Sequence, residues 1–281
     1  MITTMRLPRI TIITPSLNQG AFIEQTIVSV LGQGYPDLEY MVIDGGSTDN
    51  TLDVLRRYAG QIDWRSEPDR GQSDAINKGL QRATGDIVAF LNSDDLYEPM
   101  ALHTVGTFFA QHPRVAWATG KCRIIDARGA ETRKAITAYK NAWLYLNSTS
   151  ALHVLNYISQ PATFWRRQVI DQVGGLNEDL HYALDYEYWL RMSQHSRPGV
   201  IKRYLSAFRV HSDSKGGTAT AMQFAEELAI ARAYTGSRLL RGLHRIHGAM
   251  IVELYTQMRK QRWALFRSSA ETARALPGRL R

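Results

Sequence analysis

The sequence of 281 residues has a single cysteine, no long apolar run and no apolar stretch among its first eight residues. Because Cys122 has no second cysteine to pair with, an intrachain disulfide is excluded. No run approaches the roughly eighteen apolar residues that span a bilayer, so we expect no transmembrane helix. Residues 1–8 also lack the apolar core of a secretory signal. These absences favour a cytoplasmic location, where thiols stay reduced.

Acidic residues are scarce in the C-terminal part, and this scarcity accounts for the net charge of +8. From Arg232 onward, eleven Lys and Arg stand against two acids, whereas the preceding residues carry 23 basic and 24 acidic side chains. Most of the chain is therefore nearly neutral, which argues against a nucleic-acid-binding surface across the fold. We expect no nucleic-acid partner.

The glycine spacings of two common nucleotide sites are absent as well. Residues 44–49 read Asp-Gly-Gly-Ser-Thr-Asp and have neither the Rossmann nor the Walker spacing, which argues against a dinucleotide or P-loop site. Such a turn can still seat a phosphate at a helix N-terminus or let a nucleotide approach the backbone. It is equally typical of an ordinary turn with a helix cap.

Apolar runs of strand length alternate with helical patterns over the first 120 residues. Strands are predicted at Ile10–Thr14, Tyr40–Ile43, Ile62–Ser66 and Ile87–Leu91. The segments between them carry apolar residues at helical spacing. This alternation predicts βαβ crossovers, hence an α/β fold with a mainly parallel sheet flanked by helices.

The rest of the chain is less regular. The predicted elements are a hairpin of Cys122–Asp126 and Glu131–Ile136, a helix at Asp185–Met192 and a strand at Tyr204–Val210. A glycine pair at 216–217 suggests a boundary. We therefore predict a catalytic domain of residues 1–217 and a basic, helical C-terminal extension of residues 218–281.

Two adjacent acids end the most informative stretch of the sequence. The run 87–91 has the length of a strand buried on both faces, and it is followed by Asn-Ser and then Asp94 and Asp95. Because charge cannot continue into that interior, the acids should emerge at the strand's carboxyl end, where ligands bind in open α/β sheets. Clustered carboxylates suit a hard divalent cation. A helix cap is the alternative, but it explains only one acid.

Three further polar residues are candidates for a site. Arg70, in the polar loop 67–74, is placed to contact a diphosphate or a base, or else lies in a solvated loop. Asp185, at the start of a predicted helix, can act as a general base or as an N-cap. His211 follows a predicted strand, and it is a candidate metal ligand because the sequence also offers Asp94 as one.

The combination and order of these motifs resemble those of the family 2 inverting glycosyltransferases, whose fold is called GT-A. The matching pieces are Thr14–Asn18, Val42–Asp49, Asn77–Gly79 with Gly85 and Asp86, Asn92–Asp95, Asp185–Arg191 and His211. The resemblance implies transfer of a sugar, with inversion, from a nucleotide-diphosphate sugar, with a UDP-sugar as the expected donor. The implied acceptor is a hydroxyl of a glycan or a lipid-linked glycan in polysaccharide or glycolipid assembly.

The resemblance also implies roles for matching residues. The residues implied to contact the nucleotide are Thr14, Pro15, Asn18, Asp44, Arg70 and Ser93. Those implied to bind the cofactor, Mn²⁺ or Mg²⁺, are Asp94, Asp95 and His211. The implied catalytic base is Asp185. Two positions depart from the family's usual pattern. Asn92 replaces the first acid of Asp-x-Asp, and Leu184 replaces the Glu before the base.

These departures support one alternative function, a catalytically inert sugar-nucleotide or glycan-binding module of a polysaccharide assembly complex. A nucleotidyltransferase that activates sugar phosphates is another interpretation. That activity would need a glycine- and basic-rich loop after the first strand, and residues 18–20 do not supply one.

The C-terminal extension carries an apolar stripe at helical spacing. Its members are Leu239, Leu240, Leu243, Ile246, His247, Met250, Ile251 and Leu254, with Arg238, Arg241 and Arg245 nearby. A basic amphipathic helix of this kind can bind anionic lipid at the inner face of a membrane. It can also pack on the catalytic domain or on a partner subunit of a homo-oligomer, and packing is the interpretation that we favour.

Overall fold

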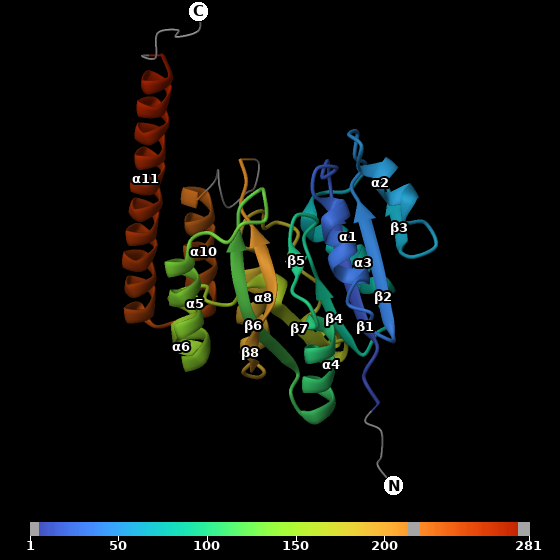
Figure 1. The fold of residues 1–281 in the computed structure, drawn as a ribbon. Coiled ribbons are helices and arrows are strands. Elements are labelled where there is room, and N and C mark those ends of the chain that lie inside the picture. Colours follow the sequence, from blue (N-terminus) through green and yellow to red (C-terminus); the bar gives the residue numbers. More distant parts are fainter. Residues whose placement is uncertain (1–5, 213–219, 275–281) are drawn as a thin grey trace, which may run out of the picture.

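A computed structural model describes residues 6–212 and 220–274 (Figure 1). The strands are β1 (Ile10–Ser16), β2 (Leu38–Asp44), β3 (Asp63–Ser66), β4 (Ile87–Phe90), β5 (Leu96–Tyr97), β6 (Trp117–Ile125), β7 (Thr163–Arg166) and β8 (Gly199–Arg209). The helices are α1 (Ile23–Leu31), α2 (Thr51–Arg57), α3 (Gln72–Arg82), α4 (Ala101–Gln111), α5 (Lys134–Leu146), α6 (Thr149–Leu152), α7 (Gln168–Val173), α8 (Leu184–Ser193), α10 (Thr220–Tyr234) and α11 (Arg238–Arg274).

All eight strands form one sheet in the order β3-β2-β1-β4-β7-β6-β8-β5. Neighbouring strands among β3, β2, β1 and β4 pair in parallel, and β6 pairs in parallel with β8. Antiparallel pairs join β4 to β7, β7 to β6 and β8 to β5. The predicted α/β architecture with flanking helices is thus confirmed.

Strand β4 shows why a continuous apolar run was needed. Val88 and Phe90 belong to one buried cluster, to which α3, α7 and α8 contribute, whereas Ile87 and Ala89 belong to a second cluster with α1, α2 and α4. Successive side chains of a strand point to opposite faces, so both faces of β4 are covered. Its chain becomes polar only where the strand leaves the core.

The parallel strands end along one edge, and polar residues gather there. Ser16 at the end of β1 is in register with Asp44 at the end of β2, and Asp44 is in register with Ser66 at the end of β3. We call residues 92–95, which include Asp94 and Asp95, the acidic turn. It follows β4, which neighbours β1 on the side away from β2. The fold therefore places the ends of these four strands, with their polar residues, at a shared edge.

The predicted strand Glu131–Ile136 is wrong. Only an isolated bridge joins Glu131 to Ile125, and α5 begins at Lys134. Arg133 has a φ of 51° in the left-handed region, which breaks the extended path directly before the helix. The hairpin turn therefore leads into a helix instead of a second full strand.

The C-terminal helices lie beside the sheet domain, and α10 packs against α8 (Figure 1). Ile230 and Ala231 of α10 are buried in the same cluster as Trp189 of α8. The division at residue 217 stays a prediction, because the glycine pair at 216–217 lies outside the described residues. Within the described ranges, no helix has the length and apolar content required to cross a bilayer.

Candidate functional site

Two strand-end loops hold each other at the edge of the sheet. The loop after β1 reaches the glycine-rich turn after β2 through Asn18, whose Oδ1 accepts the Thr48 N–H at 2.8 Å. The Asn18 N–H in turn donates to Ser47 Oγ at 2.7 Å. Asn18 adopts a left-handed φ of 53°, which asparagine tolerates better than most residues. This residue therefore fixes the two loops relative to one another.

Asp44 shapes the glycine-rich turn from inside. Its fully buried carboxylate accepts the N–H groups of Gly46 and Ser47 at 3.1 and 2.9 Å and the hydroxyls of Ser47 and Ser66 at 2.5 and 2.6 Å. Gly46 has a φ of +87°, a conformation that side chains rarely adopt. Thr14 and Pro15 are buried nearby on β1, and the Thr14 hydroxyl pairs with Tyr40 OH at 3.2 Å.

The acidic turn meets the end of β8 in space. Asp94 Oδ2 lies 3.1 Å from His211 Nε2, although 117 residues separate them in the chain. The His211 ring packs against Phe22, with ring centroids 4.5 Å apart. The structure thus brings together two of the three residues that were predicted as metal ligands, Asp94 and His211. Ser93, between them and β4, is buried.

Asp95 points the other way, into the protein. It is fully buried, and its two carboxylate oxygens accept the Arg209 N–H at 2.9 Å and the Asn92 amide at 3.2 Å. Burial raises the pKa of Asp95, and the neighbouring charge of Asp94 raises it further. Asn92 also donates to Gln160 and accepts from Gln72. The amide at position 92 therefore has donors and acceptors that a second acid would not match.

Arg209 is a residue of this site that the sequence analysis missed. It is fully buried, its Nε donates to the Asp94 carbonyl at 2.8 Å, and its Nη2 donates to Gln25 at 2.9 Å. Its Nη1 bonds the carbonyls of Asp126 and Ala127. Burial lowers the pKa of Arg209, while the carboxylates of the acidic turn oppose the change. The sequence signal that could have identified Arg209 is its position as a charged residue at the otherwise apolar end of a strand.

The residues present fit a divalent cation. Two ligand atoms about 2.1 Å from one octahedral cation and at right angles lie about 3 Å apart, close to the observed 3.1 Å between Asp94 Oδ2 and His211 Nε2. A carboxylate with an imidazole is a common donor pair for divalent metals. Within the described residues no group of three or more His, Cys, Asp or Glu converges on one point. Substrate oxygens and water would supply the other ligands.

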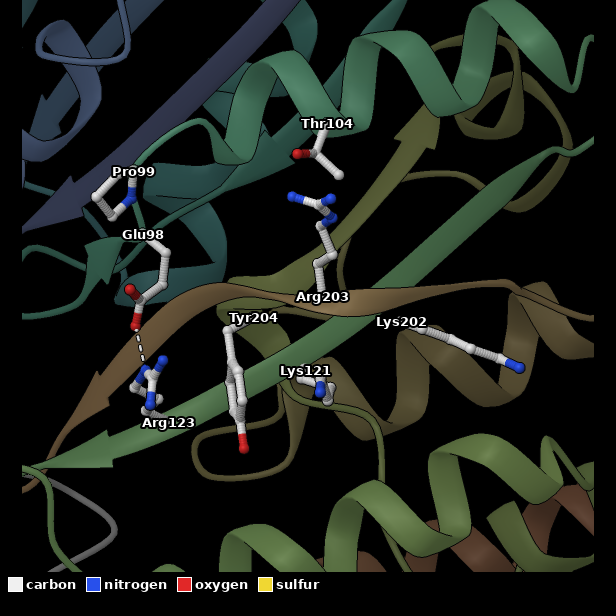
Figure 2. Close-up of a pocket in the computed structure, with 8 residues that line it drawn as sticks. All are labelled: Glu98, Pro99, Thr104, Lys121, Arg123, Lys202, Arg203 and Tyr204. Atoms are coloured by element: carbon white, nitrogen blue, oxygen red, sulfur yellow. Dashed lines mark hydrogen bonds and ion pairs between the residues drawn. The ribbon is translucent and has the colours of Figure 1, made fainter.

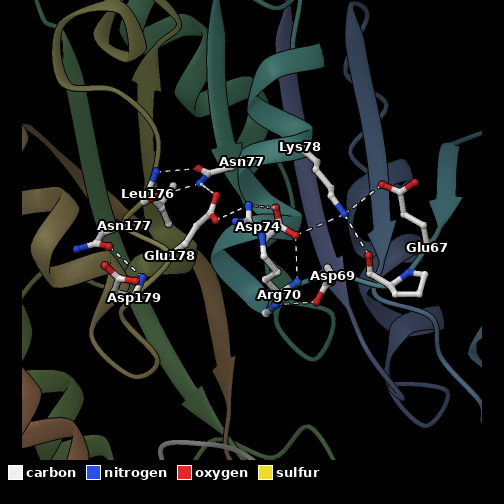
Figure 3. A network of polar contacts seen from close by, with 12 residues as sticks. Glu67, Asp69, Arg70, Asp74, Asn77, Lys78, Leu176, Asn177, Glu178 and Asp179 are labelled. Carbon is white, nitrogen blue, oxygen red and sulfur yellow. Dashed lines mark hydrogen bonds and ion pairs between the residues drawn. The ribbon is translucent and has the colours of Figure 1, made fainter.

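Arg70 lies in a separate ionic network (Figure 3). Its guanidinium pairs with Glu178 at 2.6 Å and with Asp74 at 3.2 Å, and Asp74 is also paired with Lys78 at 3.5 Å. The Arg70 side chain is 75% exposed, so these pairs are well solvated. Asn77 joins the same network and donates to Glu178. The network ties the loop after β3 to the segment that precedes α8.

Asp185 occupies the first turn of α8 and is half-buried. Burial raises its pKa, while the Tyr186 N–H, the charge of Lys140 and the Asn156 side chain favour the ionised form. Lys140 extends from α5, and burial lowers its pKa. Glu227 of α10 is buried beside this pair, and burial raises its pKa to about 7. Two acids and one lysine from three helices thus share one poorly solvated region.

A cavity of about 350 Å³ lies elsewhere, over β6, β8 and the start of α4 (Figure 2). It is lined by Glu98, Pro99, Thr104, Lys121, Arg123, Lys202, Arg203 and Tyr204. The Tyr204 ring lies 4.5 Å from Lys121 Nζ and 4.2 Å from the Arg123 guanidinium carbon. None of the predicted site residues lines this cavity, so it is distinct from the acidic turn.

The glycosyl transferase family 2 model matches residues 11–174, more than half of the chain. The chain belongs to glycosyltransferase family 2. A curated relative, the PGL/p-HBAD biosynthesis glycosyltransferase of Mycobacterium bovis, is 29% identical over 218 residues, which cover 76% of this chain and 80% of that protein. An uncharacterized glycosyltransferase of Mycobacterium tuberculosis is 28% identical over 206 residues, 72% of this chain and 75% of that protein.

Solved structures agree on the fold of this family 2 glycosyltransferase. S. aureus TarS 1–349 in complex with UDP-GlcNAc superimposes with a TM-score of 0.63 at 18% identity, covering 80% of this chain and 66% of that one. The mannosyltransferase PcManGT from Pyrobaculum calidifontis, in complex with GDP-Man and Mn²⁺, gives 0.60 at 19% identity, covering 95% and 87%. The expected GT-A-type architecture is confirmed.

Proposed function

We propose that this family 2 glycosyltransferase is metal-dependent and inverting. The observation that supports metal dependence most directly is the 3.1 Å pairing of Asp94 with His211 at the strand-end edge of the sheet. These two residues would hold Mn²⁺ or Mg²⁺, and Asp95 would add a second acidic group behind them. When bound, the cation would neutralise charge on the departing nucleoside diphosphate.

The nucleotide would lie along the same edge. Thr14, Pro15 and Ser93 would line it, together with the two turns that Asn18 and Asp44 organise. Arg70 would exchange one carboxylate partner for a diphosphate oxygen, which is feasible because its ion pairs are solvent-exposed. Solved neighbours of this fold contain UDP-GlcNAc or GDP-Man, and we propose a UDP-sugar as the donor.

Asp185 would act as the general base that takes the proton of the acceptor hydroxyl as its oxygen attacks the anomeric carbon. Burial raises the pKa of this carboxylate and so strengthens it as a base, while Lys140 favours its ionised form. A glycan or lipid-linked glycan is the proposed acceptor class, in line with the name of the mycobacterial relative. We propose that the protein works in the cytoplasm, at the inner face of the membrane.

Asp185→Asn tests the base. With a panel of UDP- and GDP-sugars and Mn²⁺, the wild-type protein should release nucleotide from its donor, and the variant should lose about 10²-fold or more of kcat. Nucleotide affinity and melting temperature should change little, because the amide keeps the side chain's shape. Asp179→Asn, at an exposed acid six residues earlier, is the matched control. Near-wild-type kcat in Asp185→Asn would place the base elsewhere.

The exposed face of α11 is proposed to contact anionic lipid. His244 packs on the body of the protein, where its ring Nδ1–H donates to the His153 carbonyl, 3.1 Å away. The opposite face leaves Leu239, Ile246 and Met250 exposed at 71%, 60% and 65%. Arg238 and Arg245 flank these residues and are exposed too. A second copy of this face would repel it through like charges, whereas an anionic bilayer complements it.

Flotation with phosphatidylglycerol-containing vesicles tests this contact. Ile246→Glu should abolish flotation, whereas Val28→Glu, at an apolar residue of α1 that is 53% exposed, should leave it unchanged. Vesicles of phosphatidylcholine alone should bind more weakly, because each basic residue contributes about 1 kcal/mol at an anionic surface. Loss of a dimer in Ile246→Glu, without any vesicle binding by the wild-type protein, would instead identify a subunit interface.

A further inference from the structure

Glu226 of α10 bonds the backbone immediately before α8. Its Oε1 accepts the His181 N–H at 3.0 Å, and its Oε2 accepts the N–H groups of Tyr182 and Ala183 at 2.7 and 2.6 Å. Three backbone donors thus converge on one carboxylate from an element more than forty residues further along the chain. Charge-assisted bonds of this kind are roughly twice as strong as neutral ones.

The position of these bonds matters because α8 begins with an unusual cap residue. Ala183 is the N-cap of α8 and has no side-chain oxygen to accept a backbone N–H. Helix N-termini leave donors unsatisfied, and a nearby anion is favourable there. Glu226 therefore accepts, from another helix, the N–H of the cap residue itself, a bond that the Glu of a capping box makes locally. The proposed base, Asp185, stands only two residues after this cap.

Helix α10 is held against α8 at a second point. Tyr234 OH donates to the Glu187 carboxylate, which also receives two bonds from Arg191. Ile230 and Ala231 lie between these polar contacts and are buried in the core cluster shared with α8. The apolar packing and Tyr234 can keep α10 docked without Glu226. The two functions, docking of α10 and ordering of residues 181–183, are therefore separable by substitution.

We propose that Glu226 is a positioning residue that sets the geometry of Asp185 by anchoring, from α10, the backbone of residues 181–183 that leads into α8. This inference rests on the proposed role of Asp185 as the base. Without Glu226, the turn at 181–183 loses its anchors and the first turn of α8 can fray, which moves Asp185 relative to the acceptor. A misplacement of about 1 Å in a reacting group can cost about a hundredfold in rate.

The experiment compares Glu226→Ala and Glu226→Gln with Tyr234→Phe in the full-length protein. Amide hydrogen exchange, read peptide by peptide, should show faster exchange across residues 181–187 in Glu226→Ala and little change there in Tyr234→Phe. Glu226→Gln, which keeps one acceptor oxygen, should lie between Glu226→Ala and wild type. Glu253→Gln, at an exposed acid of α11, controls for loss of charge.

Kinetics separate positioning from stability. At a temperature well below the melting transition of every variant, Glu226→Ala should lower kcat for nucleotide release by tenfold or more, while the affinity for UDP or GDP with Mn²⁺ changes less than twofold. Tyr234→Phe should lower the melting temperature with kcat nearly unchanged.

Two outcomes would overturn the inference. The first is unaltered exchange at 181–187 in Glu226→Ala. The second is a destabilised Glu226→Ala with wild-type kcat, which would make Glu226 purely structural. Failure of the proposed base looks different, because Asp185→Asn would then retain its activity whatever happens in the Glu226 variants.

Discussion

Replacing Arg209 by Met should destabilise the protein strongly. The guanidinium is fully buried and bonds three carbonyls and the Gln25 side chain, beside the carboxylates of Asp94 and Asp95. Methionine fills much of the volume but leaves these acceptors unsatisfied and removes the cation next to two acids. Removing one partner of a buried ionic group costs about 3–5 kcal/mol, and we expect a loss in this range.

The assay is urea denaturation followed by circular dichroism, with Arg203→Met as the matched control. Arg203 lies on the same strand but is exposed, so its replacement should change the free energy of unfolding by less than about 0.5 kcal/mol. Arg209→Met should also weaken Mn²⁺ binding in the presence of UDP, because the Asp94 carbonyl loses its anchor. A loss below about 1 kcal/mol in Arg209→Met would refute the reasoning.

Three further outcomes are expected. Lys140→Met should move the acid limb of the pH profile of kcat/KM to higher pH, because the lysine charge holds down the pKa of Asp185; an unmoved limb would exclude Asp185 as the titrating base. Asn92→Asp should lower the free energy of unfolding by about 1–3 kcal/mol in urea melts, without tighter Mn²⁺ binding, because it sets an acid against Asp95 and Gln160. Glu227 has a pKa of about 7 against an ordinary 4.5, so the folded state binds its proton more tightly and stability falls as pH rises through this window. Glu227→Gln should remove up to about 3 kcal/mol of that fall between melts at pH 4.5 and pH 8.

The N-terminal half of the fold was predictable because its signals are local. Within residues 10–91, each strand is indicated by an apolar run and each helix by the spacing of its apolar residues. The observed strand ends lie within a few residues of the predicted ones. The segment after β6 was not predictable in the same way. Whether Glu131–Ile136 continues a hairpin depends on pairing with β6, and Arg133 turns the chain into α5 instead. The β7 insertion between β4 and β6 also rests on long-range pairing alone.

Some residues of the candidate site were likewise identifiable from local sequence signals, whereas others depend on tertiary contacts. Residues that end predicted strands, such as Asp44 and Asp94, were identifiable from sequence because strand ends of a parallel sheet share an edge. Glu226 was not identifiable, since nothing in α10 indicates that its carboxylate meets the N-terminus of α8. The pairing of Arg70 with Glu178 was equally invisible, because it joins two loops whose approach only the tertiary structure defines.

The acidic turn lies between two strands of the sheet, β4 and β5, which restrain it at both ends. Strand β4 holds it from the N-terminal side, and β5, which begins at the next residue, pairs with Ala207 and Ser206 of β8, the strand that leads to His211. The two proposed ligands are therefore preorganised by one hydrogen-bonded ladder, and little chain entropy remains to be lost when a cation arrives. We expect Mn²⁺ to bind in a single fast phase limited by the exchange of its own water ligands, with no slower step of chain rearrangement behind it.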